Sequence, residues 1–263
     1  MKLPILIFMS ALVLLSCRSE ENKIIVTKVE PFVEISFVTP DSIKIYGDLY
    51  DAGKDRTSIL LFHQGGSNAR AEYSPIIPTL LEQGYNILAI DQRMGGQYYG
   101  GYNRTLVHIP TYIFGDGYGY CDAYNNLESA LDFMIESGFG GKKILWGSSY
   151  SASLAIQLAN NRQGDVAGVL AFSPASGGPM KDCLPDPYFE TLKKPLLMLR
   201  PQSEMTSERS QTQFRVADSL GHSTYVANHS IHGSSMLVSE RVRENVDDTW
   251  EVVHKFLRKV EEH

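Results

Sequence analysis

Residues 144–155 read ILWGSSYSASLA, where an apolar run enters a cluster of four serines and an Ala/Leu-rich run leaves it. The first run is typical of a buried strand and the second of a helix, so the serines fall in the turn between them. A very tight turn of this kind needs small residues two positions before and after its tip, because the backbones crowd together. Gly147 and Ser151 flank Ser149 at that spacing. We therefore predict a strand, a sharp turn and a helix, with the Ser149 side chain at the tip.

The rest of the chain repeats the strand-then-helix pattern. Residues 32–40 and 42–50 alternate apolar and polar side chains, as half-buried antiparallel strands do,. Later apolar runs suit parallel strands covered on both faces; they are residues 58–63, 85–91, 143–147, 166–173, 195–200 and 224–229. Amphipathic helical patterns cover residues 127–135 and 242–260,. The sequence thus predicts an α/β fold of three layers, with a mostly parallel central sheet flanked by helices.

Two interpretations of the serine cluster are open from the residues alone. A serine-rich stretch is also a common helix N-cap. If instead the cluster is the predicted turn, Ser149 lies at a helix N-terminus, where free N–H groups and the helix dipole favour a developing negative charge. A turn centred on Ser151, with Ser149 and Ser153 as its small neighbours, is a second register.

The pattern around Ser149 resembles the G-x-S-x-G nucleophile elbow of the α/β-hydrolase fold, with Ser151 in place of the second glycine,. Over residues 40–260 the chain resembles the dienelactone-hydrolase-like and peptidase-like esterase branches of that superfamily. Only residues 174–194 separate two of the core strands, so we expect no large lid domain. The resemblance implies a catalytic triad in the order Ser, acid, His.

The acid that this resemblance implies follows the strand at residues 195–200. Glu204 occupies that place, although a register with Ser203 or Glu208 there, or a solvated loop carboxylate, is the alternative. The histidine follows the last strand in a loop that often reads His-Gly. His232 precedes Gly233 and is our candidate, with His229 as the alternative.

An acyl-transfer site also needs N–H donors for an oxyanion. The resemblance places one at Tyr150, the residue after the nucleophile. The second is expected at Gln64 or Gly65, in a loop reading His-Gln-Gly-Gly after the strand at 58–63. His232 would take the Ser149 proton as the oxygen attacks an acyl carbonyl, and Glu204 would orient the imidazole. This chemistry requires no metal and no other cofactor.

These roles predict a hydrolase that cleaves a carboxylic ester of a small molecule or a glycan. A serine peptidase of the same fold and a non-catalytic binding lipoprotein are the alternatives. The sequence does not define the acyl group, the alcohol or the oligomeric state. Residues 94–121 form a long excursion rich in glycine and tyrosine, whose rings suit sugars or aromatic groups,. Packing of the excursion by its own aromatics is the simpler interpretation.

The N-terminus has the pattern of a secretory signal. Lys2 precedes an apolar run over residues 3–15 that is too short to span a bilayer, which needs about 20 residues,. Residues 14–17, LLSC, resemble the bacterial lipobox, in which the cysteine is acylated. We expect a lipoprotein signal peptide at residues 1–16, lipidation of Cys17, a tether at 17–30, and one domain at 31–263. The protein would be anchored by its lipid to the outer membrane of the bacterial cell envelope, on the periplasmic or the outer surface.

The net charge and the cysteines bear on nucleic-acid binding, disulfide formation and zinc binding. A net charge of −6 argues against nucleic-acid binding, which needs a basic face,. Cys121 and Cys183 could pair in an oxidising compartment, or remain two buried thiols,. No cysteine–histidine spacing typical of a structural zinc site occurs,.

Overall fold

The structure is a computed structural model that describes residues 32–109 and 119–262. The predicted signal peptide at residues 1–16, the tether at 17–30 and the lipidation site at Cys17 lie outside the described residues. So do Tyr112 and Tyr118 of the tyrosine-rich excursion.

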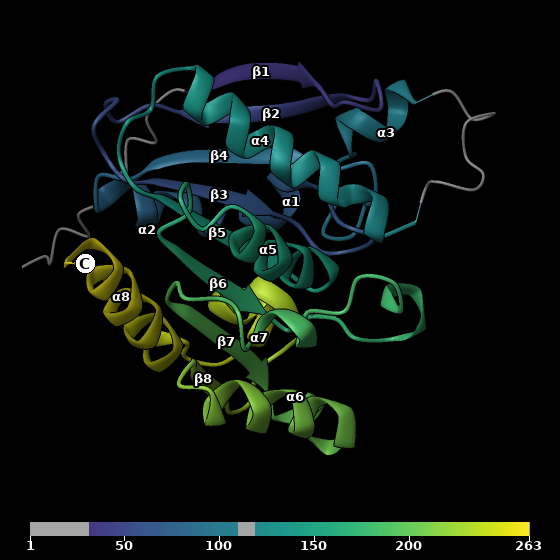
Figure 1. Ribbon diagram of the computed structural model, residues 1–263, viewed down its shortest axis with the longest axis vertical. Coiled ribbons are helices and arrows are strands. Elements are labelled where there is room, and N and C mark those ends of the chain that lie inside the picture. The colour runs from purple at the N-terminus through teal and green to yellow at the C-terminus, as the bar shows by residue number, and fades with distance from the viewer. Residues whose placement is uncertain (1–31, 110–118, 263) are drawn as a thin grey trace, which may run out of the picture.

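One sheet of eight strands runs through the molecule in the order β1-β2-β4-β3-β5-β6-β7-β8 (Figure 1). The first two strands pair antiparallel with each other, and β2 pairs antiparallel with β4. All the other neighbours are parallel. The strands are β1 (Val33–Val38), β2 (Lys44–Tyr50), β3 (Ser58–Phe62), β4 (Asn86–Asp91), β5 (Lys143–Ser148), β6 (Gly168–Phe172), β7 (Leu196–Pro201) and β8 (Ser223–Ala227).

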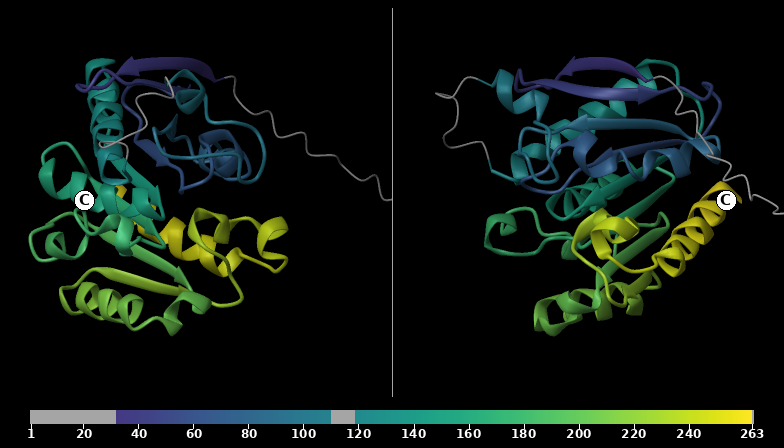
Figure 2. Two further views of the ribbon diagram at one scale, coloured as in Figure 1. Left: turned by 90° about the vertical axis from the view of Figure 1, so that its right-hand side faces the viewer. Right: turned by 180° about the vertical axis from the view of Figure 1, so that it is seen from behind.

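Helices cover both faces of the sheet. The long helices α4 and α5 pack on the near face in Figure 1, whereas α8 packs on the opposite face, as the view from behind in Figure 2 shows. The helices are α1 (Ala69–Tyr73), α2 (Ile77–Glu82), α3 (Arg104–His108), α4 (Tyr124–Glu136), α5 (Tyr150–Asn161), α6 (Glu208–Ser219), α7 (Ser239–Val242) and α8 (Asp247–Glu262). The predicted three-layer α/β fold is therefore confirmed. No described helix combines the length and the apolar character needed to cross a membrane.

The apolar strands contribute side chains to two hydrophobic cores, one on each face of the sheet. In β3, Leu60 and Phe62 pack with α4 and α5, whereas Ile59 and Leu61 pack with the layer of α1, α2 and α8. All four are fully buried. Successive residues of a strand point to opposite faces of a sheet. A strand covered on both sides therefore has to be apolar throughout, which explains why these runs do not alternate.

The carboxyl ends of the parallel strands meet at one edge of the sheet, and the two long excursions leave from that edge. The segment after β6, residues 174–194, has room for one short helix by its length. It forms instead two short 3₁₀ turns, Gly178–Met180 and Asp186–Tyr188. It carries no lid domain.

Buried ion pairs hold α3, in the middle of the tyrosine-rich excursion, against the sheet. Arg104 of α3 donates from Nε to Asp91 Oδ2 at 2.6 Å and from Nη1 to Asp48 Oδ1 at 2.7 Å. Asp91 also accepts from the N–H of Ala69 at 2.8 Å. These carboxylates are each about 2% exposed or less. Removing one partner of such a pair leaves a buried charge uncompensated, so the excursion is held firmly to the sheet at Arg104.

Candidate active site

Ser149 lies at a sharp, strained turn between β5 and α5. Its backbone has φ 62° and ψ −121°, a conformation that a residue with a side chain rarely adopts,. The N–H of Ser149 donates to Phe172 O at 2.8 Å. A Cβ on Gly147 would meet the backbone of Ala152 at 2.5 Å, so the turn requires glycine there. The turn places Ser149 directly before the first residue of α5.

The other three serines of the cluster are buried and hydrogen-bonded. Ser151 Oγ donates to Phe62 O at 2.6 Å, and Ser153 Oγ donates to Ala175 O at 2.6 Å. Ser148 Oγ accepts from the N–H of Ser234 at 3.0 Å. Each hydroxyl therefore has a specific partner, which goes beyond the small size that the sequence suggests for these positions. Ser151 is fully buried, which leaves Ser149 as the serine at the tip of the turn.

His232 and Glu204 come together from two neighbouring strand ends. His232 Nδ1 lies 2.6 Å from Glu204 Oε1, and the second oxygen, Oε2, accepts from Arg200 Nη1 at 2.7 Å. Ser173 Oγ donates to Oε1 at 3.0 Å and accepts from the N–H of Gly233 at 3.1 Å. Burial opposes ionisation of Glu204, but the hydrogen bond to His232 and the charges of His232 and Arg200 outweigh it and lower the pKa of this carboxyl,.

The alternative candidates for the base and the acid do not form such a pair. His229 and Glu208 are exposed, and Glu208 is the first residue of α6. Ser203 is also exposed, next to Glu204. Within the described ranges, neither the ring of His229 nor the carboxylate of Glu208 is hydrogen-bonded to a catalytic candidate. The His232–Glu204 pair is the one that the fold brings together.

The loop after β3, residues His63–Gly66, is called the oxyanion loop from here on. Several of its backbone N–H and C=O groups form specific hydrogen bonds. The N–H of Gln64 donates to Glu72 Oε2 at 2.8 Å. His63 O accepts from Gln92 Nε2 at 2.9 Å. His63 Nε2 accepts from the N–H of Gln92 at 3.0 Å, so the ring proton is on Nδ1, which donates to Gln64 O at 2.9 Å,.

These bonds distinguish the two donors that the sequence leaves open. The Gln64 N–H is already engaged by Glu72 and is not available to an oxyanion. A trans peptide directs its C=O and its N–H to opposite sides. Because Gln64 O is held inward by the ring of His63, the N–H of Gly65 points away from that ring. Burial of His63 lowers the pKa of its imidazole, which keeps the ring neutral and able to make both bonds. Gly65 is therefore the better candidate donor, and Gln64 has a structural partner instead.

Tyr150, the other expected donor, is the first residue of α5, and its N–H has no acceptor within the helix,. The ring of Tyr120 packs against the ring of Tyr150 and lies close to Gly65. Its centroid is 4.7 Å from that of Tyr150, and a Cβ on Gly65 would lie 2.9 Å from Tyr120 Oη. The next residue, Cys121, forms a disulfide with Cys183. The two excursions are thus joined beside the oxyanion loop.

No family model matches this sequence, and no curated protein matches it. Solved structures do match. An esterase from Pyrococcus furiosus superposes with a TM-score of 0.64 and 18% identity over 88% of this chain and 91% of the esterase. A dienelactone hydrolase from Anabaena variabilis gives 0.61 and 15% identity, over 84% of this chain and 95% of that one. An acylaminoacyl peptidase from Pyrococcus horikoshii gives 0.62 and 12% identity, over 93% of this chain and 44% of the peptidase.

The chain has the α/β-hydrolase fold. This fold places several connections at one edge of the sheet, where the parallel strands end,. They are the sharp turn after β5 and the loops after β3, β7 and β8. The candidates Ser149, Glu204, His232 and Gly65 lie at that edge because each follows a different one of these strands. Among the described residues, the Ser149 hydroxyl has no hydrogen-bond partner, and catalytic hydrogen bonds are often long in ligand-free sites.

An open cleft of about 870 Å³ adjoins the oxyanion loop and His232. Tyr99 lines this cleft, and the guanidinium of Arg241 stacks over its ring at 3.9 Å. Clefts of this size hold small-molecule ligands. The lining residues are Gln64, Gly65, Gly66, Gln97, Tyr98, Tyr99, Ile231, His232, Glu240, Arg241 and Arg243.

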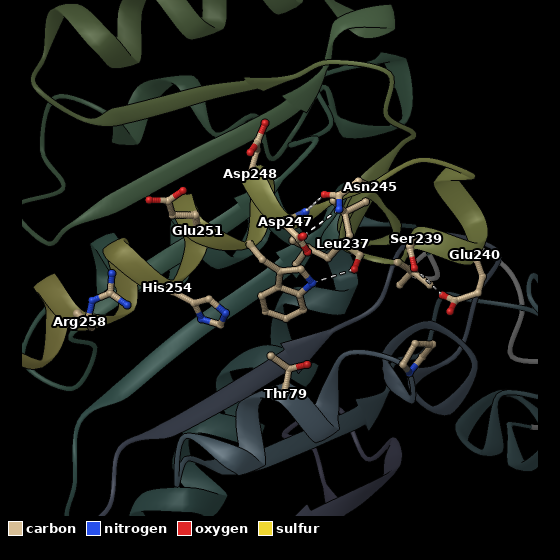
Figure 3. A pocket seen from close by; sticks show the side chains of 14 residues that line it. Thr79, Leu237, Ser239, Glu240, Asn245, Asp247, Asp248, Glu251, His254 and Arg258 are labelled. Carbon is tan, nitrogen blue, oxygen red and sulfur yellow. Dashed lines mark hydrogen bonds between the residues drawn. The ribbon is translucent and has the colours of Figure 1, made fainter. Parts of the chain in front are cut away.

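A second cavity, of about 770 Å³, lies between α2 and α8 (Figure 3). Trp250 and His254 stack along one wall with ring centroids 5.0 Å apart, and the Trp250 indole N–H donates to Leu237 O at 3.0 Å. None of the candidate catalytic side chains lines it. Its polar side chains come mostly from the exposed face of α8, so we assign it no catalytic role.

Three residues that the sequence did not indicate complete the site. Ser173 and Arg200 hold Glu204, and Glu72 holds the oxyanion loop. Arg200 ends an apolar run and is only 5% exposed; a charged residue inside a buried strand was the signal available for it. Across the described ranges, no group of three or more histidine, cysteine or acidic side chains is arranged to hold a metal ion.

Proposed function

We propose that the protein is a serine hydrolase that cleaves carboxylic esters through an acyl-enzyme, with Ser149 as nucleophile, His232 as base and Glu204 as the acid that orients it. The observation that carries the proposal is the combination of a strained turn at Ser149 with a histidine–carboxylate pair on the same sheet edge. A helix N-cap explains neither the strain nor the pair. Hydrolases among the solved structures of this fold support the same reaction class.

In the proposed mechanism, His232 accepts the Ser149 proton as Oγ attacks the acyl carbonyl. The negative charge on the carbonyl oxygen is stabilised by the N–H groups of Tyr150 and Gly65, which are oriented before substrate binds. Glu204 keeps the imidazole proton on Nδ1 and stabilises the imidazolium. His232 then protonates the leaving alcohol, and water activated by the same ring releases the acid.

The cleft supports an ester of a small molecule or a glycan as substrate. Tyr98 and Tyr99 present two rings 4.4 Å apart at its wall, and Tyr98 is 61% exposed. Exposed tyrosines offer a flat apolar face and a polar hydroxyl, which suits a sugar ring or an aromatic group.

The proposal is tested by hydrolysis of p-nitrophenyl acetate and butyrate beside the matching p-nitroanilides. We expect cleavage of the esters, loss of cleavage in Ser149→Ala, and no loss in Ser137→Ala. Ser137 is a suitable control because it follows α4 at the opposite edge of the sheet. Faster cleavage of the anilides would assign the protein to the peptidases, and ester cleavage that survives in Ser149→Ala would contradict the proposed nucleophile.

We also propose that the protein is exported and anchored by a lipid on Cys17. Support comes from the apolar N-terminal run with its LLSC ending and from the Cys121–Cys183 disulfide, because disulfides persist in oxidising compartments,. Metabolic labelling with a fatty acid analogue in a bacterial host should mark the wild type and not Cys17→Ser. Equal labelling of both would contradict the anchor.

A further inference from the structure

Glu72 is a fully buried carboxylate behind the oxyanion loop. Its Oε2 accepts from the N–H of Gln64 at 2.8 Å, while its Oε1 has no hydrogen-bond partner among the described residues. Burying a carboxylate without full hydrogen bonding is costly. Burial raises the pKa of Glu72 to about 7, although the Ser148 hydroxyl, the Gln64 N–H and the charges of Arg241 and His232 act in the opposite direction. A residue kept at such a cost beside a reactive centre indicates a functional role.

Glu72 lies where three parts of the site meet. It holds the oxyanion loop through Gln64, and the Ser148 hydroxyl beside it accepts from the N–H of Ser234 in the loop that carries His232. Arg241 completes the connection, because its Nη1 donates both to the backbone oxygen of Glu72 and to Ser235 Oγ at 3.0 Å. Glu72 is thus bonded to the oxyanion loop directly, and Arg241 links its backbone to the loop that carries His232.

We propose that Glu72 is a positioning residue of the hydrolase site, whose ionised carboxylate holds the Gln64 N–H and so aims the Gly65 N–H at the oxyanion. This inference rests on the proposed function. An ionised oxygen accepts a shorter and stronger hydrogen bond than a protonated carboxyl does. Protonation of Glu72 weakens the bond that fixes the peptide next to Gly65, and the oxyanion loop loses its preset orientation.

The groups that face Glu72 define its response to pH. Arg241 of α7 and His232 approach it with positive or protonatable groups, and Tyr73 and Tyr150 face it from α1 and α5. Burial raises the pKa of both tyrosines well above the usual value, so they stay neutral in the range of interest. Two groups therefore control the reaction on the acid side, because His232 and Glu72 must each lose a proton for full activity.

The test is the rate of inactivation by a fluorophosphonate, which reacts with the nucleophile and needs no knowledge of the natural ester. It is measured between pH 5 and 9 for the wild type, Glu72→Gln and the control Glu82→Gln, an exposed carboxylate on α2. For Glu72→Gln we expect a rate at pH 8 about tenfold lower than that of the wild type. We expect this ratio of rates to fall toward about 1 at pH 5, because protonated Glu72 holds the Gln64 N–H no better than the amide does. The control should follow the wild type.

Thermal unfolding distinguishes positioning from simple structural support. At pH 8 the substitution replaces a buried charge by an uncharged amide, so we expect Glu72→Gln to melt at a higher temperature than the wild type while it reacts more slowly. A lower melting temperature, wild-type rates in the variant, or a ratio of rates that does not change with pH would overturn the inference while Ser149 labelling leaves the proposed function intact. If the variant does not fold, a wild-type pH profile that fits a single proton loss overturns the inference by itself. A folded wild type that does not react at all would instead overturn the proposed function.

Discussion

The two loops that supply the proposed oxyanion donor and the proposed base are held in opposite ways. The oxyanion loop, His63–Gly66, is fixed by hydrogen bonds from buried residues, among them Glu72 and Gln92. The loop after β8 presents His232 with its side chain 48% exposed, oriented mainly by Glu204, which is itself 20% exposed. The donor is thus set by the protein interior, whereas the base lies at the surface and depends on one hydrogen bond to Glu204. Electrostatic stabilisation needs preset dipoles, while a base must exchange protons with solvent.

The largest effect on kcat is expected from substitutions in the exposed loop that carries His232. Replacing His232 by Ala removes the proposed base, and we expect kcat to fall by about 10⁵-fold or more. The matched variant His229→Ala, in the same loop but outside the pair, should keep nearly full activity. Steady-state ester hydrolysis measures both. A large loss in His229→Ala with activity retained in His232→Ala would reverse the assignment.

Glu204→Gln tests how far the base depends on its carboxylate. An amide can still accept from Arg200, but it does not stabilise the imidazolium, so we expect kcat to fall by about 10³- to 10⁴-fold. The pKa of Glu204 is lowered in the folded protein, so its charge stabilises the fold at neutral pH, and this stabilisation is lost as the pH falls through the folded pKa,. The variant should therefore show a weaker loss of stability on acidification. Unchanged kcat would contradict the role of Glu204.

Removing the Cys121–Cys183 disulfide tests whether the oxyanion loop is held by its own hydrogen bonds. Cys121 and Cys183 are separated by 62 residues, and closing a loop of that length stabilises a protein by about 4 kcal/mol in the chain-entropy treatment. The double variant Cys121→Ser, Cys183→Ser should lose roughly that free energy of unfolding in urea. It should retain most of its activity at low temperature, because the oxyanion loop keeps its own hydrogen bonds. A complete loss of activity in the folded variant would show that the loop depends on the disulfide.

A substitution at Gly65 is expected to lower kcat less than those at His232 and Glu204. A Cβ there would lie 2.9 Å from Tyr120 Oη, and the oxyanion loop would have to shift, so we expect Gly65→Ala to lower kcat by about 10- to 100-fold. Adding Tyr120→Ala makes room and should restore part of the activity, a non-additive result typical of residues in contact. Gly164→Ala, where a Cβ meets nothing within 4 Å, is the control. Strictly additive effects would argue against this contact.

Much of the fold follows from local patterns. Two alternating patterns and six apolar runs located the eight strands, because a strand buried on one face alternates and a strand buried on both faces is apolar throughout,. The glycine at position 147 and the serines after it predicted the turn, because that geometry excludes a Cβ at 147. Sequence spacing alone could not decide between Gln64 and Gly65. That choice depends on the bond from the His63 ring to Gln64 O and on Glu72, which reaches the loop from α1 and belongs to no motif.

The long-range partners of the acid were also beyond sequence reasoning. Ser173 follows β6 and Arg200 lies within β7, and only the packing of β6 beside β7 brings both of them to Glu204. The N-terminal predictions, from the signal peptide to lipidated Cys17, fall outside the described residues and stay predictions.

The most direct test of the central claim is identification of the residue that a fluorophosphonate modifies in the folded protein, by mass spectrometry of the labelled peptide. Ser151→Ala serves as the companion variant, since its hydroxyl is buried and bonded to Phe62 O. We expect a single adduct on Ser149, absent from Ser149→Ala and present in Ser151→Ala. An adduct on another serine, or none on the folded wild type, would contradict it.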